Sequence, residues 1–335
     1  DINPVATLIA RTKSNCYNIK RLMEYFNKIL LAFNKLNGFQ VDYEQANERI
    51  KYWYEKESYI DLAKLKKAID EVVPRKSKYY LFFMCAFSNI LKPTSRWLTK
   101  SIKPQIDPRK KPANVIKAFC DQFMFMKAAF EEVVFLGESS STIVTENFLS
   151  KKLKKPKVDL IITSPPYVTS YEYADLHQLS SLWLGYTDDY RKLRKGSIGS
   201  SHHAFDFKEI ERKLNKTASC IVSRLHEKDI SQARAVAKYF FDIQLSIKEC
   251  ETMLNNNGFL VVVIGDTEYK GVRIENSRHI SESLLENGFA EVYLFKRKIS
   301  RKNLTPYRDE FGRFTNDCGK RKVYHEEYII IGRKI

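Results

Sequence analysis

The stretch Val158 to Tyr167 reads VDLIITSPPY. The four apolar residues in its first half are typical of a buried parallel strand, which is covered on both faces and need not alternate. Pro165 and Pro166 end the strand, because proline has a fixed φ and no N–H for a sheet ladder. Open α/β sheets bind ligands beyond the carboxyl ends of their strands. We therefore expect the Ser164 hydroxyl, the Pro165 carbonyl and the Tyr167 ring to be presented together at that edge.

This segment, Thr163-Ser164-Pro165-Pro166-Tyr167, resembles the catalytic motif Asp/Asn/Ser-Pro-Pro-aromatic of the amino-group DNA methyltransferases. The form with Ser first is most similar to the enzymes that methylate cytosine N4, whereas Asp or Asn is commoner in adenine N6 enzymes. The resemblance implies a Rossmann-like α/β sheet, mostly parallel with an antiparallel last strand, and methyl transfer from S-adenosylmethionine without a metal. Ser164, Pro165, Pro166 and Tyr167 would then be the catalytic residues.

The chemistry explains these residue types. An exocyclic amine is a poor nucleophile, because its lone pair is delocalised into the base. Hydrogen bonds from its N–H groups to Ser164 Oγ and the Pro165 carbonyl would hold the nitrogen in a more tetrahedral geometry. Tyr167 would stack on the base after base flipping. The alternative is an ordinary Pro-Pro turn that follows a buried strand.

Composition indicates a polyanionic partner. The chain has 335 residues, 44% of them hydrophobic, a net charge of +17 and a pI of about 9.4. Such a charge suggests a polyanionic partner, although charge alone does not identify it. The resemblance implies that this partner is double-stranded DNA. The six cysteines include no CxxC pair and are typical of reduced cytosolic thiols. No apolar run is long enough to cross a bilayer, so we expect a cytoplasmic bacterial or archaeal protein without a membrane partner.

Two acidic residues are candidate cofactor contacts. Asn3 can cap a helix and Pro4 suits its first turn. The resemblance implies that Asp1 ends a strand and binds the ribose hydroxyls of S-adenosylmethionine. It also places Glu138 beside the adenine ring, after a short strand at Val133–Leu136, with Ser164 as a third cofactor contact. The alternative at Asp1 is an ordinary capped helix.

The glycine-rich cofactor loop of that family, Phe-x-Gly-x-Gly, is absent from this sequence. Only glycine lets the backbone approach a ligand so closely. We therefore expect an upstream segment or a second subunit to carry this loop.

Apolar spacing of three and four divides the chain. It predicts helices throughout residues 12–132. The resemblance implies that this region is a helical insertion, a candidate DNA-contacting region, within a catalytic domain formed by residues 1–11 and 133–335. The predicted elements are helices at Ala46–Val73, Lys78–Leu91, Ala113–Val133, Phe207–Leu254 (ended by Asn257-Gly258) and Ser277–Glu286, and strands at Phe259–Ile264, Val292–Phe295 and Tyr324–Ile331.

Three basic segments are candidate DNA contacts. Lys92–Pro112 has seven basic residues and four prolines, which fits a phosphate-contacting loop. Arg191–Ser201 is a second basic segment, and the loop at residues 296–322 is the third. The candidate DNA-binding residues are Arg96, Lys103, Arg109, Lys110, Lys111, Arg191, Arg194, Arg297, Lys298 and Arg301. The alternative is that these segments are solvated connectors.

The predicted function is site-specific DNA methylation, with cytosine N4 as the predicted target, in a restriction–modification system with a cognate restriction endonuclease. Three alternatives remain open. The chain could be an adenine N6 DNA methyltransferase, an RNA guanine N2 methyltransferase, or the non-catalytic DNA-binding subunit of a split methyltransferase.

Overall fold

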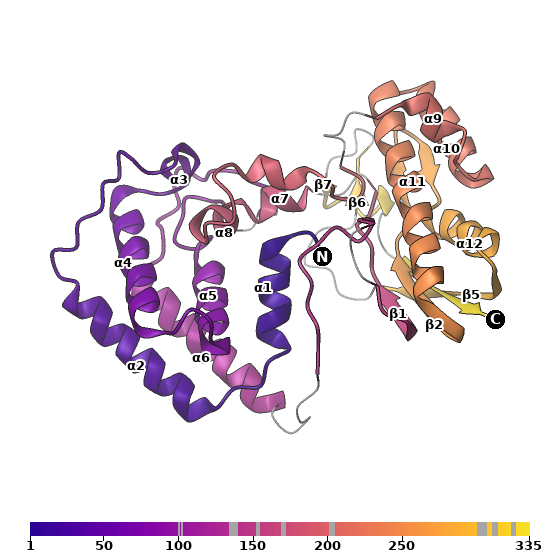
Figure 1. The fold of residues 1–335 in the computed structure, drawn as a ribbon. Coiled ribbons are helices and arrows are strands. Elements are labelled where there is room, and N and C mark those ends of the chain that lie inside the picture. The colour runs from indigo at the N-terminus through magenta and orange to yellow at the C-terminus, as the bar shows by residue number, and fades with distance from the viewer. Residues whose placement is uncertain are drawn as a thin grey trace. The chain divides into compact units, whose positions relative to one another are not determined.

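The computed structural model of the chain is a mixed α/β protein (Figure 1). The structure describes residues 1–99, 101, 103–133, 140–151, 155–168, 172–200, 205–299, 307–309, 314–322 and 326–335. The chain forms two compact units, each with a hydrophobic core of its own. The helical unit comprises Asp1–Glu146 and Tyr171–Arg194, and the sheet unit comprises Asn147–Ser170 and Lys195–Ile335.

The helical unit is built from segments whose starts are signalled locally. The side chain of Asn3 accepts hydrogen bonds from the N–H groups of Val5 and Ala6, as the capping pattern predicts, and Ser77 caps a later helix in the same way. The described elements of this unit are α1 (Pro4–Lys13), α2 (Ile19–Lys35), α3 (Glu48–Trp53), α4 (Lys56–Val72), α5 (Lys78–Ile90), α6 (Val115–Val133), α7 (Tyr173–Leu176), α8 (Gln178–Trp183) and the 3₁₀ helix η2 (Tyr190–Arg194).

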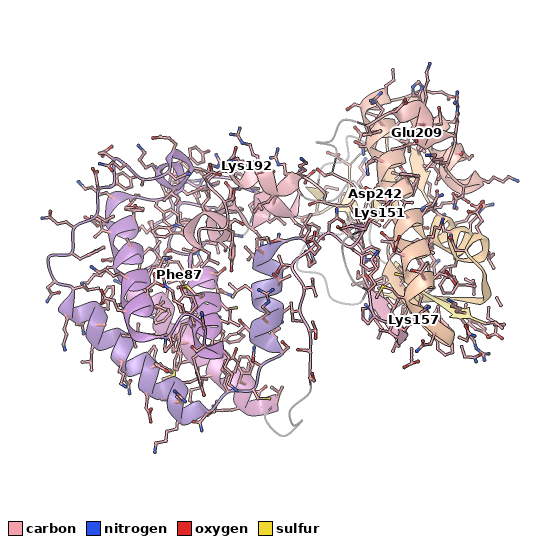
Figure 2. All side chains as sticks on the ribbon, in the orientation of Figure 1. Phe87, Lys151, Lys157, Lys192, Glu209 and Asp242 are labelled. Atoms are coloured by element: carbon pink, nitrogen blue, oxygen red, sulfur yellow. The ribbon has the colours of Figure 1, made fainter. Side chains whose placement is uncertain are left out.

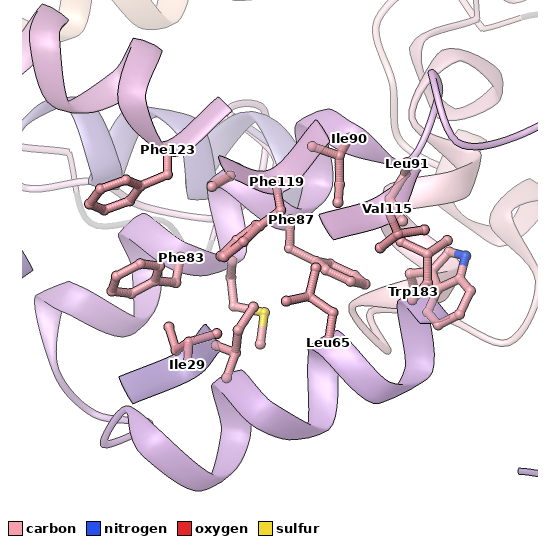
Figure 3. Close-up of a cluster of buried hydrophobic side chains, with 14 of the residues drawn as sticks. Ile29, Leu65, Phe83, Phe87, Ile90, Leu91, Val115, Phe119, Phe123 and Trp183 are labelled. Atoms are coloured by element: carbon pink, nitrogen blue, oxygen red, sulfur yellow. The ribbon is translucent and has the colours of Figure 1, made fainter. Parts of the chain in front are cut away.

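Aromatic side chains fill the core of the helical unit (Figure 3). The Phe123 ring of α6 stacks on Phe83 of α5 with ring centroids 5.8 Å apart. Trp183 of α8 meets Phe87 edge to face at 5.9 Å. Because α8 follows the SPPY segment in sequence, this core contains chain from both sides of residues 147–170.

The expected domain boundaries differ from these units at the N-terminus and at Tyr171–Arg194, which was expected in the catalytic domain and belongs to the helical unit. Residues 1–11 pack with the helical unit, since Leu8 of α1 belongs to its core. The expectation that Asp1 ends a strand is wrong, because α1 begins at Pro4 and residues 1–3 are in no strand. The expected helix at Ala46–Val73 is two helices, α3 and α4.

The sheet unit carries the segment that opened the sequence analysis. Its described elements are β1 (Val158–Thr163), α9 (Phe207–Glu211), α10 (Lys216–His226), α11 (Ile230–Met253), β2 (Leu254–Ile264), β3 (Thr267–Tyr269), β4 (Val272–Ile274), α12 (Asn276–Glu286), β5 (Phe289–Lys298), β6 (Tyr307–Arg308), β7 (Phe314–Thr315), β8 (Arg321–Lys322) and β9 (Glu326–Lys334).

In the described part of this unit, the main sheet has the strand order β1-β2-β9-β5. β1 is parallel to β2, and β9 is antiparallel to both β2 and β5. Three strands therefore run in one direction, and the last strand of the chain inserts between two of them in the opposite direction. The carboxyl ends of β1, β2 and β5 consequently meet the start of β9 at one edge of the sheet.

The prediction that β1 is buried on both faces is wrong. Leu160 is 52% exposed and Ile162 is 68% exposed. Among the described residues β1 pairs with β2 alone, and α11 packs on β2 whereas α12 packs on β5 and β9 (Figure 1). A continuous apolar run fits a strand that is covered on two faces, but burial depends on partners that the run itself does not name.

The segment around Asn257-Gly258 also differs from the prediction. The expected helix at Phe207–Leu254 is three helices, and Asn257-Gly258 lies inside β2 rather than at a helix end. Asn257 has a φ of 64°, and the pairing of β1 with β2 changes register between Val158 and Leu160. This pair therefore forms an irregularity in the strand. A residue with a left-handed backbone is common at such irregularities as well as at helix ends.

No helix in the described part of the chain is long and apolar enough to span a membrane.

Candidate active site

Two turns leave the sheet side by side. β1 ends at Thr163 and is followed by Ser164-Pro165-Pro166-Tyr167. β2 ends at Ile264 and is followed directly by Gly265-Asp266. Thr163 pairs with Val262, so the parallel register brings both turns to the same edge. This is the edge at which open α/β sheets bind ligands.

Ser164 is exposed at this edge, whereas Pro165 and Pro166 are half-buried. Within the described residues the Ser164 hydroxyl has no hydrogen-bond partner, so both of its oxygen lone pairs can accept from a ligand. The two prolines fix φ on the carboxyl side of Ser164, which limits the motion of its backbone. The site thus presents a hydroxyl on a stiff turn.

Tyr167 is held by residues at the ends of other strands of the sheet. Its ring lies against the Cα of Gly265, where an added methyl group would come within 3.1 Å of Cε2. Its hydroxyl donates to Oε2 of Glu327 at 3.4 Å. Glu327, near the start of β9, is 8% exposed and also forms an ion pair with Arg297 of β5. The aromatic ring of the motif is therefore positioned by β2, β9 and β5 together.

The turn after β2 is itself fixed by α12. Asn276 is fully buried and donates from Nδ2 to the carbonyl of Gly265 at 2.8 Å. The carboxylate of Asp266 accepts from the N–H of Ser277 at 2.9 Å, which satisfies a free donor in the first turn of the helix. These contacts hold Gly265 in place against Tyr167.

Glu327 and Asn276 were not among the predicted site residues. A signal for Glu327 was present, since Glu326-Glu327 immediately precedes the apolar run of the last strand. No local pattern pointed to Asn276, because its role depends on α12 meeting the end of β2.

The predicted cofactor contacts are placed only in part. Asp1 is exposed, and its Oδ1 accepts from the N–H of Asn3 at 2.7 Å. The other carboxylate oxygen can still accept hydrogen bonds from ribose hydroxyls, so the Asp1 side chain fits that use. Asp1 belongs to the helical unit and Ser164 to the sheet unit. Glu138 and most of the expected strand Val133–Leu136 lie outside the described residues.

The basic residues of Lys92–Pro112 divide into two groups. Lys103, Arg109 and Lys111 are exposed, and in the described part of the chain no carboxylate pairs with any of them. Their charges are therefore available to a polyanion.

Arg96 and Lys110 are instead used inside the helical unit. Arg96 Nη2 donates to the carbonyl of Tyr52 in the last turn of α3. Lys110 Nζ donates to the carbonyls of Lys92 and Trp97 at 2.9 and 2.8 Å. Burial, reinforced by the charge of Lys92, lowers the pKa of Lys110 to about 8. Both cations therefore bind backbone carbonyls of the protein. The number of basic residues in the sequence does not show which of them are used in this way.

The later basic residues mostly face acids. Arg191 pairs with Asp189 at 2.9 Å, and Arg194 pairs with Asp175 at 2.8 Å. Lys192, labelled in Figure 2, pairs with a neighbouring carboxylate at 2.6 Å. Lys298 is exposed, and Arg301 lies outside the described residues.

Comparison with known proteins gives one informative relative. The Type II methyltransferase M.MvaI of Kocuria varians is 23% identical over 358 aligned positions, which cover 99% of this chain and 78% of that protein. No family model matches the chain, and no solved structure matches it. The similarity runs through both units. It supports a methyltransferase.

The arrangement suits the positioning of a planar group that bears an N–H donor. Ser164 and the carbonyl of Pro165 offer acceptors, and Tyr167 offers an aromatic surface held by Gly265 and Glu327. The chemistry available at this edge is therefore positioning and hydrogen bonding.

Proposed function

We propose that this chain is a site-specific DNA methyltransferase that methylates an exocyclic amine, with cytosine N4 as the target. The exposed, unpaired Ser164 hydroxyl on a Pro-Pro turn at the carboxyl edge of the sheet carries this proposal. The similarity to a Type II methyltransferase along nearly the whole chain supports it.

In this proposal Ser164 and Pro165 prepare the nucleophile. The amine donates one hydrogen bond to Ser164 Oγ and one to the Pro165 carbonyl. Both bonds draw the nitrogen lone pair out of conjugation, and the stiff turn maintains their geometry. The proton that the nitrogen finally loses can pass to water, since Ser164 is exposed.

Tyr167 provides the surface for the base. A flipped base needs a stacking partner to replace the neighbours that it leaves in the duplex. The contact with Gly265 and the hydroxyl bond to Glu327 restrict the ring, so little side-chain entropy is lost when the base stacks.

The methyl donor in this proposal is S-adenosylmethionine, which supplies an electrophilic methyl group when bound. Asp1 would accept from the ribose hydroxyls, Glu138 would lie toward the adenine, and Ser164 would border the methyl group. The exposed Asp1 carboxylate and the exposed Ser164 hydroxyl fit these uses. The basic residues proposed to contact duplex DNA are Lys103, Arg109, Lys111, Lys298 and Arg301.

The proposal also includes a segment with the glycine-rich loop, either preceding these residues or on a second subunit, and a cognate restriction endonuclease. A strand of that segment could pair with the edge of β1 that has no strand partner among the described residues. Amide hydrogen exchange would report this pairing. The outward N–H groups of β1 should exchange faster than those of β2 and become protected when the segment is added.

Analysis of the methylated product tests the central proposal. The purified protein, with the loop-bearing segment if one is required, is incubated with duplex DNA and isotopically labelled S-adenosylmethionine. Digestion to nucleosides should yield labelled N4-methylcytosine, and Ser164→Ala should abolish most of it. Labelled N6-methyladenine would refute the cytosine assignment. Labelling of RNA but not DNA, or DNA binding without labelling, would refute the function.

A further inference from the structure

The described residues of the segment 96–111 (96–99, 101 and 103–111) form a basic hairpin in the helical unit. Trp97 bridges to Ile106 in antiparallel fashion, and the N–H of Leu98 donates to the carbonyl of Gln105 at 2.8 Å. Below this pairing, the N–H of Asp107 donates to the carbonyl of Arg96 at 2.9 Å. The segment that the sequence suggests to be irregular therefore has two paired arms.

The base of the hairpin is anchored in the core. Trp97 is 2% exposed and stacks on Trp53 of α3, with ring centroids 4.8 Å apart and planes inclined by 21°. Trp53 Nε1 in turn donates to the buried Oε1 of Gln178 on α8, at 2.9 Å. The hairpin is thus attached to α3 and, through it, to α8.

Two lysines brace the hairpin from within. Lys92 Nζ donates to the carbonyl of Ser101 near the tip, at 2.9 Å. Lys110 Nζ donates to the carbonyls of Lys92 and Trp97 and so joins the incoming chain to the base of the hairpin. Burial lowers the pKa of Lys92 as well as that of Lys110. These two ammonium groups are coordinated by the protein's own carbonyls.

The outer surface of the same hairpin carries the unpaired charges. Lys103 lies near the tip, and Arg109 and Lys111 lie on the chain that leaves the base. Asp107 is the one carboxylate in residues 96–111, and its Oδ1 accepts from the backbone N–H of Arg109 at 3.0 Å. Three cations therefore extend from a braced backbone, and no carboxylate among the described residues forms an ion pair with them.

We propose that the basic hairpin is a preorganised clamp for the phosphate backbone of duplex DNA, in which Lys103, Arg109 and Lys111 contact phosphates and Lys92 and Lys110 position them. This inference rests on the proposed function, which makes duplex DNA the partner. Cations held in place before binding lose less conformational entropy on contact than flexible ones do. Phosphate contacts of this kind carry affinity and register but no sequence information.

The test measures the salt dependence of DNA binding without methyl donor, so that it is independent of catalysis. The triple variant Lys103→Gln, Arg109→Gln, Lys111→Gln should reduce the slope of log affinity against log salt by about 2.7, because each phosphate contact contributes about 0.9. Its matched control is Lys20→Gln, Lys28→Gln, Lys35→Gln on α2, which removes the same charge from exposed positions of the same unit. The control should keep the wild-type slope.

Lys110→Met tests the brace. Loss of its two carbonyl contacts should loosen the hairpin, so that trypsin cleaves within residues 96–111 at least about tenfold faster, and DNA affinity should fall. Lys110→Arg keeps donors for both carbonyls and should restore trypsin resistance and affinity. If Lys110→Met weakens binding while trypsin resistance is unchanged, Lys110 itself contacts phosphate and the proposed division between brace and clamp is wrong.

Three further outcomes would overturn the proposal. The two triple variants could change the slope equally, or neither could change it. Alternatively, duplex RNA of the same sequence could bind more tightly than DNA through the same three residues. The hairpin variants could change DNA binding as expected while the protein transfers no methyl group. That result would refute the proposed enzyme activity but would still support the clamp.

Discussion

The ring of Tyr167 lies against the Cα of Gly265, although the two residues are 98 positions apart in the chain. The contact exists because β1 and β2 are parallel neighbours, so the turns that follow them leave the sheet together. A side chain at position 265 would occupy space that the ring now fills. The position of the aromatic residue of the motif thus depends on a glycine in another turn.

Gly265→Ala should therefore impair methyl transfer more than folding. The added methyl would stand 3.1 Å from Cε2 of Tyr167, so the ring must shift by a few tenths of an ångström. We expect kcat to fall by roughly tenfold, since small displacements of positioning groups are costly. In a Tyr167→Ala background the same substitution should have little further effect. Additive losses would show that Gly265 acts by another route.

Ser164→Ala should lower kcat by about 100-fold, a typical loss when one positioned hydrogen-bond partner of a reacting group is removed. Duplex DNA affinity should change less than about twofold, because the bond matters chiefly in the transition state. Ser223→Ala removes an exposed hydroxyl on α10 and serves as the control. Equal losses of kcat and of DNA affinity would argue that Ser164 has only a structural role.

Two substitutions of Tyr167 can distinguish the contribution of its ring from that of its hydroxyl. Tyr167→Ala should reduce kcat/KM by about 5- to 150-fold, the equivalent of a base-stacking contribution of about 1–3 kcal/mol. Tyr167→Phe keeps the ring and removes the 3.4 Å bond from the hydroxyl to Glu327, so its loss should stay below about threefold. Steady-state kinetics on duplex DNA measures both. A Phe variant as poor as the Ala variant would mean that the hydroxyl, not the stacking surface, is required.

Lys110 should make stability depend on pH in the alkaline range. Its pKa is lowered to about 8 in the folded chain, against about 10.4 in an unfolded chain. Between these values the unfolded chain holds a proton that the folded chain has released, so the contribution of Lys110 to stability rises with pH. The cost of burying the charge is present in full below pH 8.

Urea unfolding of the wild type and of Lys110→Met measures this contribution. The difference in unfolding free energy, wild type minus variant, should increase between pH 8 and pH 10.4. Lys111→Met, which removes the next ammonium in sequence from an exposed position, controls for the loss of one charge. If the difference in unfolding free energy decreases over this range, the folded protein stabilises the charged form of Lys110, and the prediction is wrong.

Gln178→Leu should destabilise the helical unit. Gln178 is fully buried, and its Oε1 accepts from Arg49 Nε at 2.7 Å and from Trp53 Nε1 at 2.9 Å. Leucine would leave the buried indole donor without this acceptor, at a cost of about 1–3 kcal/mol. The exposed Gln45→Leu is the control. Chemical denaturation monitored by tryptophan fluorescence should resolve the difference, and equal stabilities would show that water replaces the amide.

Local chemistry could be predicted from the sequence where a few neighbouring residues decide it. Asn3 caps α1 and Pro4 begins it, because the cap needs only a side-chain acceptor two or three residues before its donors. The helices at Lys78–Ile90 and Asn276–Glu286 follow from apolar spacing within one segment. The end of β1 at Thr163 follows from the two prolines. The resemblance of the SPPY segment to a catalytic motif also rests on adjacent residues.

Tertiary structure decided the roles that depend on distant partners. Exposure of Ile162 depends on which strands and helices neighbour β1, and an apolar run does not identify them. Glu327 reaches Tyr167 across 160 positions, because β9 inserts beside β2.

Lys110 and Lys111 are adjacent lysines in different environments. The ammonium group of Lys110 donates hydrogen bonds to two backbone carbonyls, whereas Lys111 is exposed. Sequence determined that this loop is cationic. Only the folded chain decided which of its charges remain for a ligand, since an ammonium group binds whichever acceptors the surrounding backbone brings within reach.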